Sequence, residues 1–165
     1  MRVKSCGTCG LCCKLMAIPA LEKPRHSWCP KYVMRTGCGI YADRPAACRE
    51  FLCLYMLAPE LDDAWRPDRA RFMIWTGQED RRLIVEVDPA MPAAWRREPY
   101  YTQLKPWSDQ TRPEPMEITI RIGSQVIVLF PEAEVDLGQE QALPIESGYT
   151  LEAGGYRPYA RYVAG

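Results

Sequence analysis

Eight cysteines are concentrated near the amino terminus, between positions 6 and 53, and none occurs in the rest of the 165 residues. In a reducing compartment, clustered cysteines serve as metal ligands more often than they form disulfides. Buried free thiols would explain one or two such residues but not eight. We therefore predict a metal centre whose ligands are Cys6, Cys9, Cys12, Cys13, Cys29, Cys38, Cys48 and Cys53.

The densest part of this cluster is residues 6–13, which read Cys-Gly-Thr-Cys-Gly-Leu-Cys-Cys. Two consecutive C-x-x-C steps allow a tight turn to aim three sulfurs at one metal. Gly7 and Gly10 each follow a cysteine, where a glycine permits a positive φ and lets backbone N–H groups approach the sulfur. Neighbouring residues of an extended chain point in opposite directions. Cys12 and Cys13 would therefore serve different metal ions, or one of them would not be a direct ligand.

The last two cysteines fall in a segment that predicts a helix. Asp43 is the expected N-cap, and Pro45 is tolerated in a first helical turn. This would place Cys48 near the positive end of a helix dipole, which favours a thiolate. On one continuous helix Cys48 and Cys53 would point roughly 140° apart. They can share a metal only if the helix bends or ends between them.

Residues 5–55 as a whole resemble the bacterial CxxCxxCC, or YkgJ-type, cysteine-cluster family, which is described as a zinc- or iron-chelating domain. The same cysteine pattern is similar to that of flagellin lysine N-methylases, which are thought to hold an iron–sulfur cluster. The resemblance implies metal chelation at all eight cysteines but no settled reaction. It rests on the eight cysteines together with Ile40, Tyr41, Arg44, Pro45, Arg49 and Phe51.

The identity of the metal stays open between two alternatives. Eight thiolates could form two tetrahedral zinc sites of four cysteines each, or hold iron in one or two iron–sulfur clusters. An all-sulfur ligand set disfavours magnesium, calcium and manganese. His26 is the only histidine and a weak candidate ligand, because its sequence context favours a solvated loop.

The favoured function is a metal-binding protein whose centre is structural or redox-active. The alternative is a metal-cluster-dependent enzyme that catalyses a redox reaction or a group transfer such as protein methylation. A metal-trafficking role is a third hypothesis. No nucleotide-binding glycine loop and no acid–base pair is recognisable, so no catalytic residue is assigned.

The composition narrows the partners and the compartment. Lys plus Arg equals Asp plus Glu, 21 each, so no net positive charge attracts nucleic acid. The tyrosines and arginines of residues 149–162 are therefore expected to pack rather than to bind single strands. No apolar stretch reaches the roughly 20 residues of a membrane span, and no secretion signal is seen. We expect a cytoplasmic protein that contacts an unidentified protein partner, and neither nucleic acid nor membrane.

The expected fold class is α+β, with a cysteine-cluster metal-binding module of loops and short helices at residues 1–58. Residues 59–165 should form an α+β region with antiparallel hairpins, packed against the module as one unit. Period-two alternation and β-branched residues predict its strands, and Pro99 restricts the one expected helix. The expected elements are strands at 71–76 and 82–87 joined by a hairpin connection at 77–81, a helix at 93–105, a half-buried strand at 117–122 paired with 125–130, and turns with a short strand at 148–165.

Overall fold

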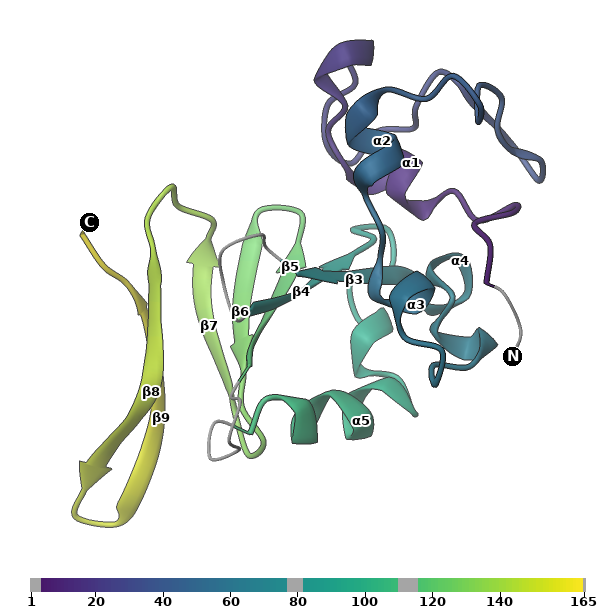
Figure 1. Ribbon diagram of the computed structural model, residues 1–165. Helices are drawn as coiled ribbons and strands as arrows, with labels where there is room; N and C mark the ends of the chain where they lie inside the picture. The colour runs from purple at the N-terminus through teal and green to yellow at the C-terminus, as the bar shows by residue number, and fades with distance from the viewer. Residues whose placement is uncertain (1–3, 77–81, 110–115, 165) are drawn as a thin grey trace. The chain divides into compact units, whose positions relative to one another are not determined.

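The computed structural model describes residues 4–76, 82–109 and 116–164, and it has a mixed α+β fold (Figure 1). The α+β expectation is therefore confirmed. The expected connection at 77–81 lies outside the described residues. The chain divides into two compact units, which are described separately below. The first comprises residues 1–75 and 86–95, and the second comprises residues 76–85 and 96–165.

The cysteine-bearing part of the first unit is built from very short elements. None of its helices exceeds five residues within the described chain, and the two strands of its only hairpin have two residues each. Helices this short are unstable in isolation, so contacts outside each helix must hold them. In chain order the elements of this unit are α1 Leu11–Leu15, η1 Pro19–Leu21, β1 Tyr32–Val33, β2 Gly37–Cys38, α2 Ala46–Glu50, α3 Leu54–Leu57, η2 Asp63–Trp65 and α4 Pro67–Ala70.

A sheet with the strand order β3-β4-β5-β6-β7 is present in the described residues. The strands expected at 71–76, 82–87, 117–122 and 125–130 are all confirmed, within one residue at their ends. The structure adds β7, which pairs antiparallel with β6. The strands are β3 Phe72–Thr76, β4 Arg82–Val87, β5 Glu117–Ile122, β6 Gln125–Leu129 and β7 Glu134–Gln139.

The centre of the second unit is more deeply buried than its alternating pattern predicts. β5 pairs antiparallel with β6, with Ile120 opposite Ile127. Ile118 and Ile120 are fully buried, as expected for the apolar side of a half-buried strand. Thr119 between them is fully buried as well, so the expectation of one solvated face is wrong at the middle of β5. A hydroxyl can be buried there because Thr119 Oγ1 donates a hydrogen bond to Glu117.

The helix expected at 93–105 is interrupted. A short turn of helix, η3 Ala94–Arg96, precedes a break at Pro99, and α5 Tyr100–Trp107 follows. Pro99 is the N-cap residue of α5, and because proline has no backbone N–H to donate, the helix does not run on from η3 through it. Tyr100 and Leu104, one turn apart on α5, are buried.

The carboxyl-terminal tail contradicts the sequence expectation. Turns with one short strand were expected, whereas the structure has a long antiparallel hairpin of β8 Ile145–Glu152 and β9 Gly155–Tyr162 (Figure 1). Its register pairs Gly148 with Tyr159 and Tyr149 with Pro158. Glycine and proline inside strands weaken the local signal for a strand, and only the pairing along the whole hairpin compensates for it. In the described residues, no helix has the length and apolar character needed to cross a membrane.

Candidate metal centre

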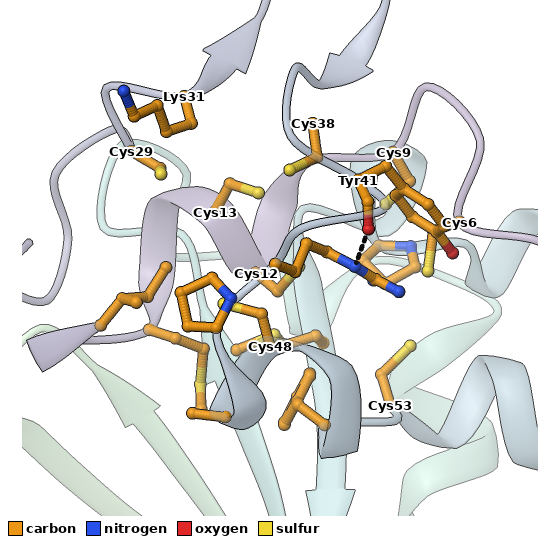
Figure 2. Close-up of a pocket in the computed structure, with 18 of the residues that line it drawn as sticks. Cys6, Cys9, Cys12, Cys13, Cys29, Lys31, Cys38, Tyr41, Cys48 and Cys53 are labelled. Carbon is orange, nitrogen blue, oxygen red and sulfur yellow. Dashed lines mark hydrogen bonds between the residues drawn. The ribbon is translucent and has the colours of Figure 1, made fainter. Parts of the chain in front are cut away.

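All eight cysteines line a single pocket of the first unit, with a cavity volume of about 120 Å³ (Figure 2). They come from the turn before α1, from α1 itself, from the loop and hairpin at 29–38, and from the segment of α2 and α3. All eight are free thiols. The structure thus brings together every ligand expected from the sequence, although the first and the last are separated by most of the unit's chain.

The turn at 6–13 has a positive φ at Gly7 but not at Gly10, whose φ is −137°. The backbone N–H of Cys9 donates to the carbonyl of Cys6 at 2.8 Å, and Gly7 has a φ of +47°. α1 then begins at Leu11, so Cys12 and Cys13 are consecutive on a helix and about 100° apart around its axis. The extended backbone assumed from the sequence is wrong here, and the thiols of Cys12 and Cys13 are close enough to share a hydrogen bond.

The second group of segments is tied to α1 by backbone hydrogen bonds. The N–H of Cys29 donates to the carbonyl of Cys13 at 2.8 Å, and the N–H of Tyr32 donates to the carbonyl of Cys29 at 3.0 Å. Tyr32 is in turn paired with Cys38 across the β1–β2 hairpin. A continuous chain of contacts therefore leads from Cys13 through Cys29 to Cys38.

Cys48 and Cys53 do not share a helix. α2 ends at Glu50, and Cys53 is the N-cap residue of α3. The helix therefore ends between the two cysteines, which is the condition under which they could share a metal. The expected start of the helix is wrong, because Pro45 rather than Asp43 is the N-cap of α2 and no side chain caps it.

At Gly37 the β1–β2 hairpin comes into close contact with the backbone of the turn at residues 6–13. Gly37 has a φ of +105°, and a Cβ on it would lie 2.6 Å from the carbonyl oxygen of Gly7. No L-residue side chain fits such a position without strain. The sequence indicated that glycine lets the chain bend next to Cys38, but it did not reveal this contact.

Replacing Gly37 with alanine should therefore displace the hairpin that bears Cys38. Positive φ and the clash with a backbone oxygen together should cost about 2 kcal/mol of unfolding free energy. Chemical denaturation followed by circular dichroism measures the loss. The matched control is Gly154→Ala, since nothing lies within 4 Å of a Cβ at that position. Equal stability of the two variants would contradict this account of Gly37.

The thiols are not equally acidic. Burial raises the pKa of Cys9, Cys48 and Cys53. A hydrogen bond from the Cys12 thiol lowers the pKa of Cys13 to about 7, with help from the charges of Lys23 and Arg44, and the same bond raises the pKa of Cys12. Cys13 therefore deprotonates before Cys9, Cys12, Cys48 and Cys53. These four need a bound cation to become thiolates, so metal binding would release protons.

Lys23 is a residue of this site that the sequence did not single out. It is only 4% exposed, and its Nζ donates to the carbonyl of Lys14 at 2.9 Å and to that of Met16. It thereby binds free carbonyls at the end of α1 and adds a positive charge near the thiols of Cys13 and Cys29. An isolated Lys before a proline gives no sequence signal for either role.

An ion cluster centred on the buried carboxylate of Asp88 holds α1 through Lys14. Lys14, directly after Cys13, donates to Asp88 Oδ1 at 2.6 Å, and Arg71 donates to Asp88 Oδ2 at 2.5 Å. Asp88 is fully buried, and the backbone N–H of Ala90 donates to it as well. The position of α1, and with it that of Cys12 and Cys13, therefore depends on one carboxylate.

His26 is not the solvated residue that its sequence context suggested. Its Nε2 lies 3.1 Å from Oε1 of Glu86, a buried carboxylate that also accepts a hydrogen bond from Arg25 at 2.9 Å. His26 does not line the pocket of the cysteines. His26 lies in a turn, as the sequence predicts, but its side chain is half-buried by this contact rather than fully solvated.

The eight thiols line the pocket without being gathered around a single point. In the ranges 4–76, 82–109 and 116–164, no three Cys, His, Asp or Glu side chains stand close enough together to hold one ion. A tetrahedral zinc site needs sulfurs roughly 3.8 Å apart, given Zn–S bonds of about 2.3 Å. The thiols therefore surround the cavity and would have to move inward around single ions. By chemistry, eight soft sulfur donors fit zinc, iron or an iron–sulfur cluster.

Comparison with known proteins assigns neither a family nor a function to this chain. The chain matches no protein-family model, no curated protein and no solved structure. The resemblance to the CxxCxxCC family consequently stays a prediction from the cysteine pattern.

Proposed function

We propose that this protein binds zinc or iron, the latter also as an iron–sulfur cluster, through its eight cysteine thiolates. The metal centre has a structural or redox role in a cytoplasmic protein. The observation that carries the proposal is that all eight free thiols line one pocket. Scattered structural cysteines have no reason to converge from so many separate segments. A reducing cytoplasm would keep such thiols available to metal.

The surroundings of the pocket support a structural centre. Short helices and a two-residue hairpin present the cysteines, and a metal bound by several segments would hold these together. The side chains of Met16, Phe51 and Met73 also line the pocket. Such apolar neighbours exclude water from thiolate ligands and so help to retain the metal.

Elemental analysis of protein purified without oxygen tests the proposal. We expect at least one zinc or iron per chain, with a colourless sample for zinc and a brown sample for an iron–sulfur cluster. The matched control is a variant with all eight cysteines replaced by serine, purified in parallel. A wild-type metal content no higher than that of the control would end the proposal.

A second candidate function is a metal-cluster-dependent enzyme. It is favoured by the polar side chains of Lys31, Tyr41 and Arg44, which line the same pocket, with Tyr41 about half exposed. An open coordination position there would admit a small molecule. Addition of cyanide to the metal-loaded protein distinguishes the candidates, because a closed structural centre keeps its absorption spectrum and an open one changes it.

A further inference from the structure

The cysteines of the pocket fall into two groups rather than one ring. Cys12 and Cys13 stand at the boundary between them, as neighbours about 100° apart around the axis of α1 whose thiols are joined by a hydrogen bond. The other boundary is the break between α2 and α3, which separates Cys48 from Cys53. The thiols of one group can therefore be traced from Cys12, and those of the other group from Cys13.

One group gathers on the apolar core of the first unit. Cys9, Cys12 and Cys53 all pack against the cluster of Leu11, Leu15 and Met73. Cys6 is joined to Cys9 by the backbone hydrogen bond of the first turn. It also interacts electrostatically with both Cys12 and Cys53. In Figure 2 the labelled side chains of Cys6, Cys9 and Cys53 lie on the same side of the pocket.

The other group follows the contacts that begin at Cys13. The backbone hydrogen bond from Cys29 to Cys13 and the pairing of Tyr32 with Cys38 connect three of its members. Cys48 completes it, because its strongest electrostatic interactions with other thiols are with Cys13, Cys29 and Cys38. Figure 2 shows Cys13, Cys29 and Cys38 along the opposite side of the pocket from Cys53.

We propose that the eight cysteines form two adjoining four-thiolate metal sites, one of Cys6, Cys9, Cys12 and Cys53 and the other of Cys13, Cys29, Cys38 and Cys48. This inference rests on the proposed function and specifies it. Four sulfur ligands per site is the number that both all-cysteine zinc and common iron–sulfur clusters take. The adjacent Cys12 and Cys13 place the two centres on either side of a single peptide bond.

Pairwise serine substitution tests the assignment. Three double variants are compared with the single variants Cys53→Ser and Cys29→Ser, each purified without oxygen and analysed for metal per chain. Cys9→Ser with Cys53→Ser removes two ligands of one site, and Cys29→Ser with Cys48→Ser removes two of the other. Cys29→Ser with Cys53→Ser removes one ligand from each site.

We expect each single variant and each double variant within a site to retain half of the wild-type metal. The variant that crosses the sites should retain almost none. The assignment is overturned if a double variant within one site loses as much metal as the crossed variant. Wild-type protein without metal would instead end the proposed function, so the two failures are distinguishable.

Titration of the wild-type protein decides the matter even if the variants do not fold. Reduced, metal-free protein is titrated with cobalt(II), whose sulfur-to-metal absorption bands report thiolate ligation. Two ions per chain at saturation, each with tetrahedral all-thiolate bands, is the expected result. Saturation at one ion per chain would show that the thiols do not divide into two sites.

Discussion

Removal of the metal should unfold the cysteine-bearing segment, residues 6–53, and leave the pairing of β5, β6 and β7 intact. The segment's helices are at most five residues long, and its strands have two. Such elements cannot pay their own ordering entropy, because helix nucleation alone is unfavourable. In small zinc domains the metal contributes about 10 kcal/mol or more of folding free energy. Loss of the metal is therefore the largest single change we expect.

Hydrogen–deuterium exchange with mass spectrometry measures this result segment by segment. Peptides from residues 6–53 should lose protection when a strong chelator and a reductant are added. Peptides from β5 and β6 serve as the internal control, because their protection rests on buried strand pairing. Unchanged protection of residues 6–53 in metal-free protein would show that packing alone holds this segment.

Replacing Asp88 with asparagine should produce the second-largest loss of folding stability that we expect. The side chain of Asp88 is fully buried and accepts hydrogen bonds from both Lys14 and Arg71. Removing one partner of a buried ion cluster leaves uncompensated charges and costs about 3 kcal/mol. Because Lys14 directly follows Cys13 on α1, metal affinity should fall as well. Denaturant unfolding and competition with a chromophoric chelator measure the two effects.

The matched control is an exposed ion pair of the same charge type. Arg157 and Glu152 lie 3.7 Å apart at the surface, so Glu152→Gln should change stability by less than about 1 kcal/mol. A comparable effect of the two substitutions would contradict the anchoring role of Asp88.

The effect of Asp88 should also depend on pH. Burial raises the pKa of this carboxyl, but the hydrogen bond and charge of Lys14, the N–H of Ala90 and the charge of Arg71 outweigh it and leave the pKa lowered. A lowered folded-state pKa contributes stability that is complete above the unfolded value of about 3.9 and is lost as the pH falls through the folded value. The stability difference between wild type and Asp88→Asn should therefore be full at neutral pH and shrink below about pH 4.

Part of the fold was predictable because its signals are local. The strands β3 to β6 were expected from β-branched residues and alternation, which depend on neighbours in the chain. The β8–β9 hairpin was missed because Gly148 and Pro158 oppose strand formation locally. The pairing of eight residues on each strand overrides that preference, and such pairing cannot be read from either strand alone.

The helix around Cys48 was likewise predicted only in part from local sequence signals. Helical geometry predicted only a condition, that Cys48 and Cys53 can share a metal if the helix bends or ends between them, and the structure has such an end at Glu50. The capping residue was assigned wrongly to Asp43. The preference of Asp for an N-cap position is worth only about 1 kcal/mol. Packing of the surrounding segments can override it, and α2 begins after Pro45 instead.

Residue types and spacing alone predicted the eight thiols as the reactive atoms and a soft metal as their partner. That these thiols line one pocket, which of them are neighbours, and that Lys23 and Asp88 support them became visible with the three-dimensional fold. Sequence spacing constrains residues only within a turn or two of chain. The neighbours of Cys29, Cys38 and Cys53 are set by backbone hydrogen bonds and by packing between distant segments.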